Sequence, residues 1–249
     1  MERRGTGNPV LSEKFFTRAA NYTGDNVMTI GGTMNKTILL FLLLLLAAAY
    51  VWKQVMAGIP GAFGYMTAGF VVGFILALVT TFKVQWSPYT APLYAVMEGL
   101  ALGGLSAIFE VQYPGLVMRA VVLTFGTFFM ILFLYRSRIV KPTQRFVMGI
   151  VAATGGIMIV YLVGWIASLF GASVSLLYGN STLSIGFSLF VVVIAALNLI
   201  LDFSFIEQMS KTGAPKFMEW YAGFGLIVTL VWLYIEILRL LVKLAANRE

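Results

Sequence analysis

The chain has 249 residues and a net charge of +7, but only 11% of its residues are charged while 60% are hydrophobic. Its mean hydropathy is +0.91, and a soluble domain of this size needs far more polar surface, so the composition predicts an integral membrane protein. Cysteine and histidine are absent, which excludes a disulfide framework, a thiolate site and a histidine-based metal site. In this composition the basic residues indicate topology at loop ends and not a nucleic-acid surface.

Residues 1–36 form a polar segment with five basic and three acidic side chains. The segment has no apolar run of its own and lacks the apolar centre of a secretory signal, so we expect a flexible cytoplasmic tail. The remaining residues, 37–249, are expected to form one transmembrane domain.

Seven apolar segments follow the tail, each within the range of about 17–25 residues that transmembrane helices occupy. Their long apolar runs favour helices over the alternating strands of a barrel. All seven prolines lie in the tail, in loops or at the starts of spans, which supports this segmentation. The expected spans are 37–55, 63–82, 93–109, 116–134, 146–169, 184–206 and 217–241. The fold class is therefore an all-α polytopic membrane protein with a seven-transmembrane-helix bundle.

The Lys and Arg residues predict the orientation. With the N-terminus in the cytoplasm, twelve of the seventeen basic residues lie on the cytoplasmic side. The positive-inside rule then predicts a multi-pass protein of the cell (inner) membrane with its C-terminus outside.

Two intramembrane carboxylates lie at similar depth near the cytoplasmic side, Glu98 in the third span and Asp202 in the sixth. Ionisable groups within the hydrocarbon cost about 2.5–3.5 kcal/mol even on the mildest scale, so both are functional candidates. No basic residue stands at their depth, so a facing pair would hold a proton near neutral pH and could also offer oxygen ligands to Ca²⁺. Two alternatives stay open: Asp202 marks the end of its span at the headgroups, or Glu98 finds a separate partner within the bundle.

Other polar groups follow the same helices. Near the outer side, four charged residues can neutralise one another as pairs: Glu110, Arg119, Glu236 and Arg239. In the sixth span, small and polar residues recur at spacings of three and four: Ser184, Ser188, Val191, Ala195, Asn198 and Asp202. A similar stripe in the seventh includes Gly225, Thr229, Glu236, Arg239 and Lys243. Both stripes should face protein or water and not lipid.

Glycines spaced four apart, Gly69 with Gly73 and Gly99 with Gly103, predict close packing of the second and third spans. The chain contains no phosphate-binding loop, no dinucleotide fingerprint and no Ser-His arrangement. We therefore expect neither enzymatic activity nor a cofactor.

Four stretches together resemble bacterial members of the Bax-inhibitor-like (transmembrane Bax inhibitor motif) family. They are residues 119–127 (RAVVLTFGT), 198–207 (NLILDFSFIE), 211–221 (KTGAPKFMEWY) and 233–241 (LYIEILRLL). The resemblance implies a bundle in which the last helix is central. It also implies a pH-sensitive leak of calcium or other cations, with two aspartates on the sixth and seventh helices as proton sensor and gate.

Asp202 matches the first aspartate of that pair, whereas Thr229 occupies the place of the second. Glu236 lies seven residues later on the same face, about 10 Å further along the helix, and Glu98 is the best substitute for the missing carboxylate. Asn198 and Thr229 could add oxygen ligands for a cation.

Two functions from different classes remain. The leading hypothesis is a cation leak through the bilayer, with Ca²⁺ and protons as partners, gated by protonation of Asp202 and an acidic neighbour. The alternative is a non-transporting interaction protein that modulates another membrane protein, such as a quality-control protease.

Overall fold

The computed structural model describes residues 26–140, 142–171, 174–179 and 181–247. Seven helices in these ranges are long and apolar enough to cross a membrane, so the predicted seven-helix bundle is confirmed. They are α2 (Ile30–Met56), α3 (Ala62–Phe82), α4 (Ser87–Gln112), α5 (Leu116–Arg136), α6 (Gln144–Leu169), α8 (Thr182–Lys211) and α9 (Met218–Ala246). Two short helices, η3 (Val84–Trp86) and α7 (Ser175–Tyr178), lie in the connections.

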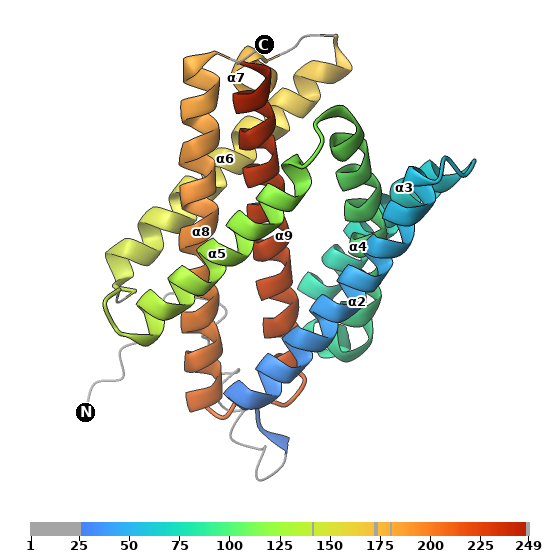
Figure 1. Ribbon diagram of the computed structural model, residues 1–249. Coiled ribbons are helices and arrows are strands. Elements are labelled where there is room, and N and C mark those ends of the chain that lie inside the picture. The colour runs from blue at the N-terminus through green and yellow to red at the C-terminus, as the bar shows by residue number, and fades with distance from the viewer. Residues whose placement is uncertain (1–25, 141, 172–173, 180, 248–249) are drawn as a thin grey trace.

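The last helix occupies the centre of the bundle, as the family resemblance implied. α9 packs against α2, α4, α5 and α8, and Figure 1 shows it between α8 on one flank and α4 on the other. Most of its buried apolar residues belong to two clusters, one around Leu199 and Leu233 and one around Leu40 and Ile227, while Met218 and Ala222 belong to a third. We call the end of the bundle where α2 and α9 begin the N-terminal side, and the opposite end the C-terminal side.

Several helices extend beyond the apolar spans that predicted them. α2 begins at Ile30 and not at residue 37, because the Thr29 side chain accepts a hydrogen bond from Gly32 N (2.9 Å) and caps the helix. α8 continues to Lys211 and α9 to Ala246. Hydropathy marks where the hydrocarbon ends, whereas a helix continues into the polar region until a cap or turn stops it. Residues 1–25 of the predicted tail lie outside the described residues.

Glycines bring three of the helices close together. A Cβ added at Gly103 would lie 2.8 Å from Ala48 Cα, and one added at Gly99 would lie 2.8 Å from the Ala47 side chain. Both of these neighbours belong to α2. At Gly69 on α3, an added Cβ would be 2.5 Å from the Met97 carbonyl oxygen of α4. The prediction that all four glycines serve the contact between α3 and α4 was therefore wrong for Gly99 and Gly103, which join α4 to α2.

On the N-terminal side, the segment before α2 is fastened to the segment before α9. Met28 N donates to Ala214 O (2.7 Å), and Lys216 N donates to Asn26 O (2.9 Å). These bonds hold the first described residues against the loop that leads into the central helix.

A buried acidic side chain completes this fastening. Glu219, only 1% exposed, accepts hydrogen bonds from Thr29 N (2.9 Å) and Thr29 Oγ1 (3.0 Å) and forms an ion pair with Lys36. Gly32 leaves the necessary room, since a Cβ there would lie 2.5 Å from the Glu219 carboxyl carbon. We call Thr29, Gly32, Lys36 and Glu219 the clasp. It fixes residues that the sequence assigned to a flexible tail.

Candidate functional site

Asp202 lies on α8 where that helix packs against α9. Its Oδ2 is buried and has no hydrogen-bond partner among the described residues. Thr229 of α9 is the hydrogen-bonding side chain beside the carboxyl group. Its single hydroxyl proton is shared with Gly225 O within its own helix (3.2 Å). A buried polar oxygen without a partner costs about 1–3 kcal/mol, and more when it is charged. One oxygen of the Asp202 carboxyl group is thus enclosed by protein without a partner among the described residues.

Apolar residues next to Asp202 on α8 and next to Thr229 on α9 pack together. Leu199 and Phe203 of α8 and Leu226 and Leu230 of α9 are all buried in one cluster. Asp202 and Thr229 therefore lie where α8 and α9 pack against each other.

The polar stripe on α8 faces protein along most of its length. Ser184, Ser188, Val191 and Ala195 are all buried. Asn198, one turn before Asp202, donates to Thr154 Oγ1 of α6 (2.9 Å) and to Ile194 O (2.9 Å). Asn198 thus has partners of its own, whereas one oxygen of the neighbouring Asp202 carboxyl group has none among the described residues.

Glu98 lies elsewhere in the bundle. Its hydrogen-bonding neighbour is Tyr94, one turn earlier on α4, and a Cβ added at Gly73 of α3 would lie 3.4 Å from Glu98 Oε2. Asp202 instead faces α9, which lies between α4 and α8 (Figure 1). The structure therefore does not bring Glu98 and Asp202 together as a pair, although the sequence predicts similar depths for them.

Glu236 belongs to a network on the C-terminal side. Tyr161 of α6 donates to Glu236 Oε1 and Oε2 (2.9 Å each), and Arg239 Nη1 contacts Glu236 Oε1 (3.2 Å) and Tyr161 Oη (2.6 Å). One turn further on α9, the buried Lys243 donates to Ser184 Oγ and Ser188 Oγ (2.8 Å each). Glu236 is thus partnered by Tyr161 and Arg239, which join α6 to α9, while Lys243 separately joins α9 to α8.

The two remaining charged candidates have separate surroundings. Glu110 accepts hydrogen bonds from Gly115 N (2.7 Å) and Val117 N (3.4 Å), so it caps the first turn of α5 and faces the positive end of the helix dipole. Arg119 is exposed and forms no salt bridge among the described residues. The expected outer-side pairing therefore holds for Glu236 with Arg239 and not for Glu110 with Arg119.

The described residues contain no group of three or more Asp, Glu, His or Cys side chains that could hold a metal ion. Ca²⁺ takes about 6–8 oxygen ligands, and Asp202 and Glu98 face different helices. The structure thus gives no joint calcium site made from these two carboxylates.

Sequence reasoning missed the clasp and Tyr161. Lys36 and Glu219 are 183 positions apart in the sequence. Their pairing could have been suggested only by the position of both charges at the same end of their predicted spans. Tyr161 carried no signal, because a tyrosine in an apolar span also fits a packing role.

Fold and site together define a polytopic helical membrane protein whose last two long helices enclose a carboxyl group with an unpartnered oxygen. A family model described as Bax inhibitor 1 like matches residues 8–246, nearly the whole chain, and the chain belongs to this family. No curated protein and no solved structure matches it.

Proposed function

We propose that the protein is a pH-responsive cation leak pathway, with Ca²⁺ among its ions, in which protonation of Asp202 shifts an equilibrium between closed and open arrangements of α8 and α9. The observation that carries this proposal is the buried Asp202 Oδ2, which lacks a hydrogen-bond partner among the described residues. Membership of the Bax inhibitor 1 like family supports it. No enzymatic step and no cofactor enters the proposal.

The physical reason lies in the two forms of the carboxyl group. A charged carboxylate needs water, a cation or several hydrogen-bond donors, whereas the neutral acid tolerates a packed apolar contact far better. Thr229 supplies one hydroxyl, and no basic side chain forms a salt bridge with Asp202 in the described part of the chain. The two protonation states therefore favour different arrangements of α8 and α9, which is what a proton-sensing gate requires.

Glu98 and Glu236 have lesser roles in this proposal. Glu236 is held by Tyr161 and Arg239, so its charge is already compensated. Glu98 is a second intramembrane carboxylate on a different helix contact, and it acts independently of Asp202 in the closed arrangement. We further propose that the N-terminal side faces the cytoplasm of a cell (inner) membrane.

The test uses purified protein in sealed phospholipid vesicles, with Ca²⁺ and K⁺ fluxes measured across a range of pH. Asp202→Asn mimics the neutral acid at every pH, so its flux should stay at the level that the wild type reaches at the acidic end. Asp202→Glu should keep a pH dependence. Glu98→Gln is the matched control, because it neutralises another intramembrane carboxylate and should leave the pH profile in place.

Two outcomes would contradict the proposal. A pH profile of Asp202→Asn that matches the wild type would remove Asp202 as the sensor. Absence of any flux from correctly folded wild-type protein would remove the leak itself and favour the alternative, a membrane protein that modulates another membrane protein without transport.

A further inference from the structure

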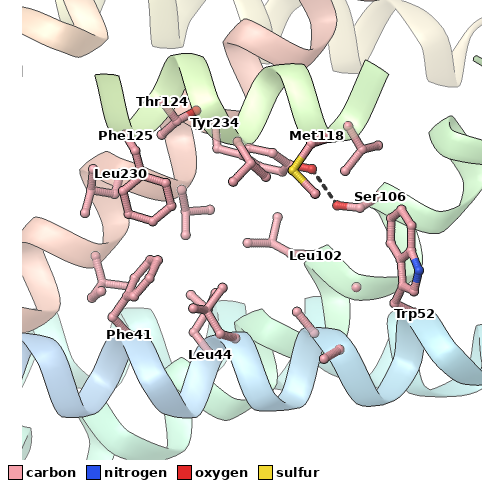
Figure 2. A pocket seen from close by; sticks show the side chains of 18 of the residues that line it. Phe41, Leu44, Trp52, Leu102, Ser106, Met118, Thr124, Phe125, Leu230 and Tyr234 are labelled. Carbon is pink, nitrogen blue, oxygen red and sulfur yellow. Dashed lines mark hydrogen bonds between the residues drawn. The ribbon is translucent and has the colours of Figure 1, made fainter. Parts of the chain in front are cut away.

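A cavity of about 460 Å³ lies between α2, α4, α5 and α9, and Asp202 is not among its lining residues. Its size falls within the range of about 300–1,000 Å³ that small-molecule sites occupy. Figure 2 shows its walls, with α5 along one side and α2 along the other. The lining is predominantly apolar, including Leu44, Leu102 and Leu230, so its occupant must be largely hydrocarbon.

The cavity runs along the helices. On α2 its lining extends from Phe41 to Trp52, which at 1.5 Å per residue corresponds to about 16 Å. The hydrocarbon core of a bilayer is about 30 Å thick, so the cavity is about as long as one leaflet is deep.

The two ends of the cavity differ. At one end, the rings of Phe41 and Phe125 meet edge to face with centroids 5.4 Å apart and close the space between α2 and α5. At the other end lie Trp52 and the hydrogen-bonded pair of Ser106 and Tyr234 (2.6 Å). Tryptophan and tyrosine are typical of the membrane interface, so the polar end points toward a membrane surface and the aromatic end toward the bilayer centre.

The cavity opens sideways, where the helices face lipid. Leu45 of α2 and Met118 of α5 both line the cavity, yet they are 44% and 66% exposed on the outer surface of the bundle. An occupant can thus enter from the hydrocarbon without passing through water.

The polar end restricts the headgroup. Glu110 lines the cavity there, and its carboxylate would repel the carboxylate of an ionised fatty acid while attracting an ammonium group. A zwitterionic phospholipid offers an apolar chain for the slot and an ammonium group for Glu110, while its phosphate must lie away from that carboxylate.

We propose that this cavity holds one acyl chain of a zwitterionic phospholipid from the leaflet on the C-terminal side. The chain lies along Leu44, Leu102 and Leu230, and its headgroup stays at the surface beside Trp52 and Glu110. This site is independent of the proposed leak, because it uses neither Asp202 nor ion flux.

The test measures phospholipid bound to the full-length protein after detergent extraction, by mass spectrometry under non-denaturing conditions with added phosphatidylethanolamine. Val121→Phe fills the cavity from α5, and Ala49→Phe fills it from α2. The matched control is Val122→Phe, the next residue of α5, whose side chain is 62% exposed and does not line the cavity.

We expect the wild type and Val122→Phe to retain one phospholipid per chain, and both filling variants to lose it while keeping the unfolding temperature of the control. Retention of the phospholipid by a folded filling variant would overturn the assignment to this cavity. Absence of a bound phospholipid from the wild type, or a fatty acid or other apolar molecule in its place, would overturn the assignment of the ligand.

Discussion

Replacing Lys36 with methionine should destabilise the protein strongly. The clasp holds the start of α2 against the start of α9 through the buried Glu219, whose side chain is 1% exposed while that of Lys36 is 19% exposed. Lys36→Met keeps most of the apolar stem but removes the only cation that pairs with Glu219 among the described residues. The carboxylate would then keep only the two donors of Thr29.

The magnitude follows from this burial. Removing one partner of a buried ion pair costs about 3–5 kcal/mol, because the other charge stays buried without compensation. Lys36 is partly exposed and water could replace some of its contact, so we expect the lower end, about 3 kcal/mol. This corresponds to about a hundredfold change in the unfolding equilibrium.

The sharper test is a rescue. Adding Glu219→Gln to Lys36→Met removes the buried charge and retains a carbonyl oxygen that accepts from Thr29, so the double variant should be more stable than Lys36→Met alone. Unfolding in detergent micelles, followed by circular dichroism, gives the free energies. Lys83→Met is the matched control, since Lys83 is exposed on the same side. The reasoning would be refuted if the double variant were no more stable than Lys36→Met. It would also be refuted if Lys36→Met lost no more stability than the control Lys83→Met.

Two further predictions concern packing and topology. Gly103→Ala should lower the free energy of unfolding by about 1–3 kcal/mol, because its Cβ would lie 2.8 Å from Ala48 Cα. Gly126→Ala is the control and should not lower the free energy of unfolding, since a Cβ at that position meets no atom within 4 Å. Equal losses of stability for the two variants in the same unfolding assay would contradict this prediction. The chain lacks cysteine, so a single introduced cysteine can report on which side of the membrane a loop lies. In intact cells, a membrane-impermeant thiol reagent should label Gln112→Cys and should not label Lys83→Cys. The reverse labelling pattern would contradict the proposed topology.

The sequence predicted the number and approximate bounds of the long helices because the hydrocarbon requires long uncharged runs. It also predicted which face of α8 is buried, since small and polar residues such as Ser184 and Ser188 recur at helical spacing. These properties depend on one helix at a time, so a single sequence is enough to find them.

Pairing of residues on different helices could not be predicted in this way. The sequence predicts similar depths for Glu98 and Asp202, but pairing also needs side chains that point toward each other, and α9 lies between their helices. The partner of Glu219 lies 183 positions away, in residues assigned to a tail. Depth can be counted along a chain, whereas the direction in which a side chain points depends on which helices are neighbours. For the same reason, the sequence predicted that Gly103 contacts α3, whereas it contacts α2.

The distribution of contacts along α9 constrains any opening between α8 and α9. One end of α9 is held by the clasp through Glu219, and the other by Lys243, which binds Ser184 and Ser188 of α8. Asp202 lies between these two attachments and has a buried oxygen without a partner in the described structure. A rigid shift of α9 would break both attachments, whereas a local separation in the middle would break neither and would give the carboxylate access to water. If ions pass between α8 and α9, the helices must therefore part at Asp202 first, while both ends of α9 stay attached.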